Sequence, residues 1–329
     1  MKHNSVCVAA IALVALVVGP AYAQFNGGNV LGDAGVGSGT QPPPGWNVGA
    51  LYYRYTTNTV LKADGSRIVF DPSQPGSLTS DAIAPMVVFV SRAKIFGADY
   101  GIVFAPSLAN ASLEAPVFGM QKKVGTGAGD LYFLPITLGW HKKQADIKAS
   151  FGFFAPTGRY TAGADDNLGK GMWCYELSAG TTVFLDSRKA WSAATTAFWE
   201  THSKKSVGIA IGDRVKLVDV NVGQILTLEG GLGRSFLQGA ASVGVAYYAQ
   251  WKLTDDHFAT VIDLPLESPI GKHRVYGVGP DLTLPIAVKK RLVSLVNIRY
   301  FWETGARVKT QGQSLLITAM FPVPSPKIQ

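Results

Sequence analysis

The stretch DLYFLPITLGW, Asp130 to Trp140, decides the fold class of this chain. One set of alternate residues, from Tyr132 to Trp140, is wholly apolar and has an aromatic residue at each end, whereas the other set includes Thr137 and Gly139. Such alternation predicts a β-strand, because successive side chains of a strand point to opposite faces. Strands of about 9–11 residues with aromatic residues at both ends are typical of transmembrane β-barrels.

The same alternation recurs at twelve places along the chain. The predicted strands cover residues 46–56, 83–92, 95–106, 129–141, 144–155, 172–185, 190–202, 217–230, 238–253, 272–285, 291–303 and 312–322. The connections between them are alternately long and short, as extracellular loops and periplasmic turns are in outer-membrane barrels. Strands of soluble β-sandwiches are shorter, about 5–6 residues on average, and have no reason to end in aromatic residues. The sequence therefore predicts an all-β fold, a transmembrane antiparallel β-barrel of about twelve strands with short periplasmic turns and long extracellular loops.

Residues 1–23 have the pattern of a cleaved signal peptide. Lys2 and His3 precede a short apolar run, and Ala21-Tyr22-Ala23 follows it as the cleavage site. The apolar run is shorter than the ~20 residues that a membrane helix needs. We therefore expect an exported protein of the Gram-negative outer membrane, which requires the barrel-assembly machinery during its biogenesis.

The remaining chain divides into three parts. Residues 24–45 are rich in Gly and Pro and show no periodicity, which indicates an irregular segment. Residues 46–322 form the predicted barrel, and residues 323–329 form a short tail. Once the signal peptide is removed, Cys174 is the one cysteine left, so we expect no internal disulfide and a packed, unreactive thiol.

The composition indicates a membrane partner. Charged residues make up 16% of the chain, against about a quarter in ordinary globular proteins. The net charge is +8, but the basic residues are not grouped with aromatic residues as in a nucleic-acid groove. We therefore expect contacts with the lipid bilayer and with lipopolysaccharide phosphates, and no nucleic-acid partner.

The face opposite the apolar one contains ionisable residues, which predicts a polar lumen. By parity, these residues are Arg54, Asp99, Asp146, Lys148, Glu176, Glu200, Asp219, Glu229, Lys252, Asp281 and Arg299. Paired charges commonly fill the interior of a narrow barrel, and this structural role is expected for most of them. The functional alternative is a substrate path along a polar constriction beside apolar patches. The residues predicted for that path are Phe133, Phe154, Phe198, Asp146, Lys148, Glu176, Glu200 and Arg299.

The connection APTGRYTAGADDNLGKGMW, Ala155 to Trp173, has the composition of a ligand-binding loop. It lacks the spacing of a phosphate-binding P-loop, and a strand rather than a helix is predicted to follow it. It also lacks the alternate oxygen ligands and the final Glu of an EF-hand, although an adventitious surface calcium ion stays open. We interpret it as an extracellular loop whose Asp165, Asp166 and Lys170 face water or lipopolysaccharide. The residues predicted for a gate there are Arg159, Tyr160, Asp165, Asp166 and Lys170.

No catalytic chemistry is predicted. The His-x-Ser-Asn-Gly motif of the outer-membrane phospholipase is absent, and His141, His202, His257 and His273 are isolated from any nucleophile. No metal-ligand spacing is present, so neither a metal nor another cofactor is expected.

The central block of the chain resembles the MetA-pathway phenol-degradation family. The similar features are the strand opening at Asp130–Pro135, Phe-x-x-Pro-Thr-Gly-x-Tyr at Phe153–Tyr160, Asn-Leu-Gly at Asn167–Gly169 and the strand start at Trp173. The resemblance implies an outer-membrane transporter that takes up small hydrophobic, often aromatic, compounds by facilitated diffusion. A looser similarity to the long-chain fatty acid transporter family implies that residues 24–45 form a plug in the lumen.

Two other functional classes stay open. The first is a structural or adhesive barrel with a closed lumen, whose loops bind a partner. The second is an outer-membrane hydrolase, which the missing nucleophile and base make the weakest hypothesis.

Overall fold

The computed structural model describes residues 25–69, 71–73, 75–211, 214–259, 272–289 and 291–323. The predicted signal peptide and residues 324–329 of the predicted tail lie outside the described residues. Within these ranges, no helix has the length and hydropathy needed to cross a bilayer.

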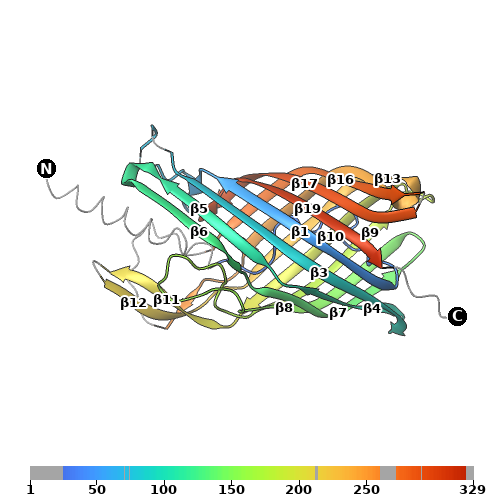
Figure 1. The fold of residues 1–329 in the computed structure, drawn as a ribbon, viewed down its shortest axis with the longest axis horizontal. Coiled ribbons are helices and arrows are strands. Elements are labelled where there is room, and N and C mark those ends of the chain that lie inside the picture. Colours follow the sequence, from blue (N-terminus) through green and yellow to red (C-terminus); the bar gives the residue numbers. More distant parts are fainter. Residues whose placement is uncertain are drawn as a thin grey trace.

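Twelve antiparallel strands close into a barrel, which confirms the predicted fold class (Figure 1). They are β1 (Gly45–Thr57), β3 (Ser77–Ile95), β4 (Ala98–Ala105), β7 (Leu131–His141), β8 (Ala145–Ala155), β9 (Cys174–Phe184), β10 (Trp191–His202), β13 (Ile225–Phe236), β14 (Ala241–Lys252), β16 (Arg274–Val288), β17 (Arg291–Arg307) and β19 (Gln313–Val323). Each strand pairs with its neighbours in chain order, and β1 pairs with both β3 and β19. The barrel therefore has no free edge along these pairings.

The connections differ between the two ends of the barrel, as the sequence predicts. Short turns follow β3, β7, β9, β13 and β16, and we call this the short-turn end. The other connections meet at the long-loop end. They contain the small strands β2 (Val60–Leu61), β15 (His257–Phe258) and β18 (Lys309–Thr310).

Two of the long connections fold into hairpins that lengthen the barrel wall. The first pairs β5 (Leu108–Ala115) with β6 (Met120–Ala128), and the second pairs β11 (Lys204–Ile211) with β12 (Arg214–Asn221). The sequence predicts plain loops at 107–128 and 203–216, so these hairpins correct that prediction. Figure 1 shows both hairpins projecting from the same end of the barrel.

The predicted strand at 217–230 is wrong in its position. Residues 214–221 form β12, residues 222–224 belong to no strand, and the barrel strand β13 begins at Ile225. The run Gly230-Gly231-Leu232-Gly233 reads as a turn in the sequence but lies inside β13. A Cβ atom on Gly231 or Gly233 would collide with Val36 from the N-terminal segment. These glycines therefore mark a close approach inside the barrel, as glycines in strands often do.

A β-bulge in β7 inverts the side-chain directions at the start of that strand. The register with β8 shifts between Phe133 and Ile136, so Ile136 and Trp140 face outward as predicted, but Tyr132 points inward. Phe133 packs against Phe104 and Phe153 on the outer surface. Its predicted place on the lumen path is therefore wrong, because one extra residue reverses the alternation.

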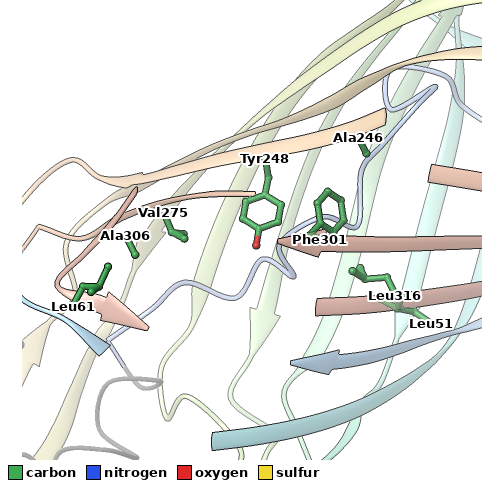
Figure 2. Close-up of a cluster of buried hydrophobic side chains, with 8 residues drawn as sticks. All are labelled: Leu51, Leu61, Ala246, Tyr248, Val275, Phe301, Ala306 and Leu316. Carbon is green, nitrogen blue, oxygen red and sulfur yellow. The ribbon is translucent and has the colours of Figure 1, made fainter. Parts of the chain in front are cut away.

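The outer face of the barrel is apolar, and the inner face contains a small hydrophobic cluster. Large side chains exposed on strands include Ile147, Leu177 and Val245, with 43%, 49% and 55% of their surface accessible. Inside, Tyr248 and Phe301 lie side by side, with ring centroids 5.0 Å apart, as Figure 2 shows. The cluster consists of Leu51, Leu61, Ala246, Tyr248, Val275, Phe301, Ala306 and Leu316. An apolar exterior around a partly polar interior is the arrangement of a membrane barrel.

Candidate functional site

The N-terminal segment, residues 25–44, lies inside the barrel. Phe25 packs against Phe258 and Val207 at the long-loop end, and Gly45 pairs with Val90 near the short-turn end. Between these points, Gln41 is 2% exposed. The segment therefore runs through the lumen from one end to the other.

Acidic side chains of the barrel wall bind the backbone amides of this segment. The bonds run from Gly28 N and Asn29 N to Glu200 Oε1 (2.6 and 3.1 Å), from Gly32 N to Glu229 Oε1 (3.0 Å), from Ala34 N to Glu229 Oε2 (2.8 Å) and from Val36 N to Asp281 Oδ2 (2.9 Å). A chain without strand partners has buried N–H groups that need acceptors, and the lumen carboxylates supply them. Glu200 and Glu229 are fully buried, so each bond is shielded from water.

Arg299 binds the carbonyl side of the same segment. Its Nε lies 3.0 Å from Asp281 Oδ2, and its Nη1 donates to the carbonyl oxygens of Gly32 and Asp33. Asp281 thus accepts from both the wall and the segment, and its negative charge is balanced by the guanidinium beside it.

A second group of lumen residues lies on β7, β8 and β9. Tyr132 donates to Glu176 Oε1 at 2.7 Å and stacks on Phe154 at 4.3 Å between ring centroids. Glu176 is directly opposite Glu200 in the pairing of β9 with β10. Because Lys148 lies close to Glu176 and to Asp33 of the segment, a cation lies among these carboxylates.

A cavity of about 590 Å³ lies in the long-loop half of the lumen. The first residues of the N-terminal segment form one wall, and the loop ends of β1, β3 and β5 form another. Its apolar lining includes Phe25, Val30, Leu31, Tyr53, Val60, Leu78, Leu113 and Val117. The volume is within the usual range of about 300–1,000 Å³ for sites that bind small molecules.

One wall of the cavity is polar and carries positive charge. Lys309 donates to Gln250 Oε1, which is 3.2 Å from His273 Nε2, and Lys170 and Lys252 also line the cavity. Lys252 is bound to Asp256 at 2.8 and 2.9 Å. Burial lowers the pKa of Lys309 to about 8. This wall can therefore donate hydrogen bonds to a ligand whose apolar part lies in the rest of the cavity.

The connection 156–173 bridges the two hairpins of the long-loop end. On one side, Lys122 Nζ of β6 lies 2.8 Å from Asp165 Oδ2. On the other, Tyr160 donates to the carbonyl oxygen of Ser206 in β11 at 2.5 Å. The Lys122 bond lowers the pKa of Asp165 and favours its charged form. The connection is thus folded against the wall at both sides.

Asp130 anchors the same connection at its two ends. Its carboxylate accepts from Gly158 N at 3.0 Å and from Lys170 N at 2.8 Å. Within the connection, Arg159 bonds to the carbonyl oxygen of Asp166 at 3.1 Å and lies 3.5 Å from its carboxylate. The polar residues of this loop therefore act first on the loop's own conformation.

Comparison with known proteins places this chain in a family. The model of the family described as "Putative MetA-pathway of phenol degradation" matches residues 57–318, which include eleven of the twelve barrel strands in whole or in large part. The chain belongs to this family. The resemblance of the Asp130–Trp173 block is thereby confirmed, and that block includes the bridging connection and its Asp130 anchor.

A solved structure shows the same fold at low sequence identity. An outer membrane channel from Pseudomonas putida F1 is 13% identical, with a TM-score of 0.64 over 87% of this chain and 98% of that one. The toluene transporter TodX from P. putida is 12% identical, with a TM-score of 0.44 over 87% of this chain and 92% of that one. Among curated proteins, none matches this sequence significantly.

Most residues predicted for a substrate path in this family member lie in the lumen, but most of them hold the N-terminal segment. Phe154, Glu200 and Arg299 contact it directly. Asp146 accepts from Thr40 of the segment at 2.9 Å. Phe198 belongs to the inward set of β10, between Thr196 and Glu200.

Three further predictions about side-chain direction are wrong. Arg54 lies on the outer face, where it is 3.6 Å from Asp81. Asp219 lies on β12, outside the barrel wall, and pairs with Lys204 at 2.7 Å because the predicted strand there belongs to a hairpin. Lys170, predicted to face water or lipopolysaccharide, instead lines the cavity, since the Asp130 anchor turns the end of the loop inward.

Sequence reasoning missed the polar wall of the cavity. Lys309 and Thr310 belong to a connection without periodicity, and His273 stands alone before β16. A signal was available in Glu303, which has the same parity as Arg299 in the predicted strand 291–303 but was not among the predicted lumen residues. Glu303 accepts from Tyr55 and Tyr248 at 2.8 and 2.9 Å. Among the described residues, no group of His, Cys, Asp and Glu could hold a metal ion.

Proposed function

We propose that this chain resides in the outer membrane and takes up small hydrophobic, chiefly aromatic, compounds by facilitated diffusion. The observation that supports this most directly is the cavity of about 590 Å³ in the long-loop half of the lumen. Its apolar walls suit a ring or a short chain, and no covalent step is needed to move a compound down its gradient. Family membership and the channel from P. putida F1 with the same fold support this proposal.

The cavity favours compounds that combine an apolar body with one polar group. Tyr53, Leu113 and Val30 would contact the apolar part, whereas Lys309 and His273 would bind a hydroxyl or carboxyl group. A ligand-binding site typically has a few polar groups in an apolar pocket, and these groups fix the ligand's orientation. We therefore propose that phenols and aromatic carboxylates bind more tightly than the unsubstituted hydrocarbons.

Passage beyond the cavity requires movement of the N-terminal segment, which we propose to be a plug. The segment forms the floor of the cavity with residues 25–31 and continues to the short-turn end. A compound in the cavity meets Leu31 and Val30 before it meets the carboxylates deeper in the lumen. A small displacement of this part of the plug would be sufficient to release the ligand, while the lower contacts stay in place.

The proposal is tested by uptake of a radiolabelled aromatic at low external concentration, in cells with and without the gene. A cavity-filling variant, Leu113→Trp, should lower uptake to near the level without the gene. Leu108→Trp, on the same strand but with a side chain 47% exposed, is the matched control and should transport normally. Equal uptake by all four strains would contradict a transport function. Heat-modifiable gel migration of each variant checks that the barrel has folded.

A structural or adhesive barrel with a closed lumen is the second candidate. The observation that favours it is the ladder of bonds between the N-terminal segment and Glu200, Glu229 and Asp281, which closes the lower lumen. Under this hypothesis, the Leu113→Trp variant would change neither uptake nor growth on an aromatic carbon source. Binding of cells to surfaces would instead depend on the hairpin loops.

A further inference from the structure

Three arginines line a second pocket that adjoins the main cavity, and one of them, Arg67, lines both. Arg67 comes from the connection after β2, and Arg274 and Arg307 come from the long-loop ends of β16 and β17. The pocket has a volume of about 520 Å³ and is open to the surroundings. The other residues lining it are Thr59, Leu61, Gly65, Gly305, Ala306 and Gln311, none of which is acidic.

The arginines are held close together, with no counter-charge bound to them among the residues that the structure describes. Arg274 is directly opposite Arg307 in the pairing of β16 with β17, and like charges at such positions are destabilising. No carboxylate of the described residues forms an ion pair with Arg67, Arg274 or Arg307. Asp64 lies near Arg307, but it is bound to Ser66 at 2.8 and 2.7 Å in its own turn.

The guanidinium groups are oriented by neutral partners, which leaves donors for a ligand. Arg307 donates to the carbonyl oxygen of Ala63 at 2.9 Å, and Arg67 donates to Thr59 Oγ1. The guanidinium carbon of Arg274 lies 6.0 Å from the ring centroid of Tyr276, and its Nε atom is buried with no partner among the described residues. A buried donor without an acceptor is costly, so an external acceptor would stabilise this arrangement.

The pocket lies at the level where lipid headgroups meet the barrel. Tyr276 and Trp251 form an aromatic pair on the outer face, with 3.3 Å between indole Nε1 and the phenol oxygen. Trp302, farther down β17, is 51% exposed. Trp and Tyr concentrate at the membrane–water interface. Arg274 and Arg307 come next to these aromatic residues on the loop side, so the arginines are at headgroup height.

We propose that Arg67, Arg274 and Arg307 bind a phosphate group of the outer-leaflet glycolipid, lipopolysaccharide. Guanidinium groups form paired, parallel hydrogen bonds with phosphate oxygens, and basic pockets on membrane proteins bind anionic headgroups. The phosphate would separate the opposed charges of Arg274 and Arg307 and would accept from the buried Nε. The proposal does not depend on the uptake function, although Arg67 also lines the main cavity, and it rests only on residence in the outer membrane.

The test uses the purified full barrel in detergent, and follows its thermal unfolding during titration with three probes. The probes are diphosphorylated lipid A, the same lipid after removal of its phosphates, and inorganic phosphate. Phosphorylated lipid A should raise the unfolding temperature in a saturable way, and the other two probes should not do so at the same concentration. Arg274→Gln and Arg307→Gln should each weaken the apparent affinity at least tenfold.

Two further variants keep the outcome interpretable. Arg67→Gln lies on a connection rather than on a barrel strand, so it should weaken lipid binding without preventing barrel folding. Arg188→Gln, in the turn at the opposite end of the barrel, is the matched control and should bind lipid A normally. An equal response to lipid with and without phosphate, or unchanged affinity in all three pocket variants, would overturn the proposal. An equally strong response to inorganic phosphate would overturn the lipid assignment and make the pocket a site for free anions.

Discussion

Glu229 shows how single residues of the lumen are matched to the N-terminal segment. Its two carboxylate oxygens accept from the side chain of Asn29 and from the amides of Gly32 and Ala34, at 3.2, 3.0 and 2.8 Å. A carboxylate with three donors is stable in a buried position because its lone pairs are bound. The same donors would be left without acceptors if the side chain were removed.

Removal of this side chain should therefore loosen the plug. In Glu229→Ala, the buried amides of Gly32 and Ala34 lose their acceptor, at a cost of about 1–3 kcal/mol each. We expect a higher ion conductance in planar lipid bilayers, with more frequent transitions between levels. Glu229→Gln, which keeps one acceptor oxygen, should give a smaller change, and Asp219→Ala in the β11–β12 hairpin should give none. Identical conductance of Glu229→Ala and the parent would contradict a sealing role for this contact.

Gly233 gives a second prediction at the same scale. A Cβ atom there would lie 2.6 and 2.9 Å from the two Cγ atoms of Val36, closer than atoms can approach. Gly233→Ala should therefore displace the plug. Overpacking of this kind lowers the free energy of unfolding by about 1–3 kcal/mol, so the unfolding temperature should fall by several degrees.

The double variant Gly233→Ala/Val36→Ala tests the stated cause. Because the second substitution removes both Cγ atoms, it should restore most of the lost stability, which a double-mutant cycle measures as a coupling energy. Additive losses in the double variant would show that the glycine is needed for the strand rather than for the plug.

At the scale of elements, the connection 156–173 acts as a clamp between two hairpins. It is bound to β6 through the Lys122–Asp165 ion pair and to β11 through the Tyr160–Ser206 bond. The two hairpins are not paired with each other, since β6 and β11 belong to separate sheets. The clamp therefore links the two hairpins directly, and its role as a gate stays a prediction.

Cross-linking the clamp should test this role. Lys122→Cys/Asp165→Cys replaces the ion pair by two thiols, and Cys174, the other cysteine of the described residues, is buried. Because a lysine side chain is longer than a disulfide spans, the two thiols are joined with a bis-methanethiosulfonate cross-linker. If movement of the clamp admits substrate, uptake should fall after cross-linking and return after reduction with dithiothreitol. The two single-cysteine variants are the controls and should not respond. Unchanged uptake by a fully cross-linked double variant would exclude this side of the clamp as the gate.

At the scale of the whole molecule, strands distant in sequence assemble the cavity's charged wall. Lys309 in β18 lies outside the barrel strands, and its pKa is lowered to about 8 by burial and by the neighbouring Lys170 and Lys252. Glu303 and Glu200 oppose this shift. The groups Tyr55, Tyr248 and His273 line the same region. Lys309 is thus cationic below about pH 8 and neutral above it.

Binding of an anionic aromatic should follow this titration. An aromatic carboxylate stays ionised from pH 6 to 9, so changes in its affinity report on the protein. Because the anion favours cationic Lys309, affinity should be greatest below pH 8 and should fall about tenfold between pH 7 and pH 9. Lys309→Met should bind the carboxylate weakly at every pH, while a neutral aromatic should show no such dependence in either protein. A flat pH profile for the carboxylate in the parent protein would contradict this assignment.

The sequence by itself determined the wall of the barrel. Period-two alternation is local, because each strand must present apolar side chains to lipid regardless of its neighbours. It therefore predicted the closed antiparallel barrel, the number of its strands and the alternation of short and long connections. The family block at Asp130–Trp173 was equally readable, because its residues are close together in the chain.

Only the tertiary structure decided what fills the lumen. The bulge that turns Phe133 outward is one extra residue, invisible in a pattern that continues through it. Gly231 and Gly233 read as a turn until Val36 is seen against them. The sequence predicts that the acidic residues of the lumen pair with basic ones, whereas Glu200, Glu229 and Asp281 bind amides of the N-terminal segment. In each case, the deciding partner is distant in the chain, so local periodicity contains no information about it.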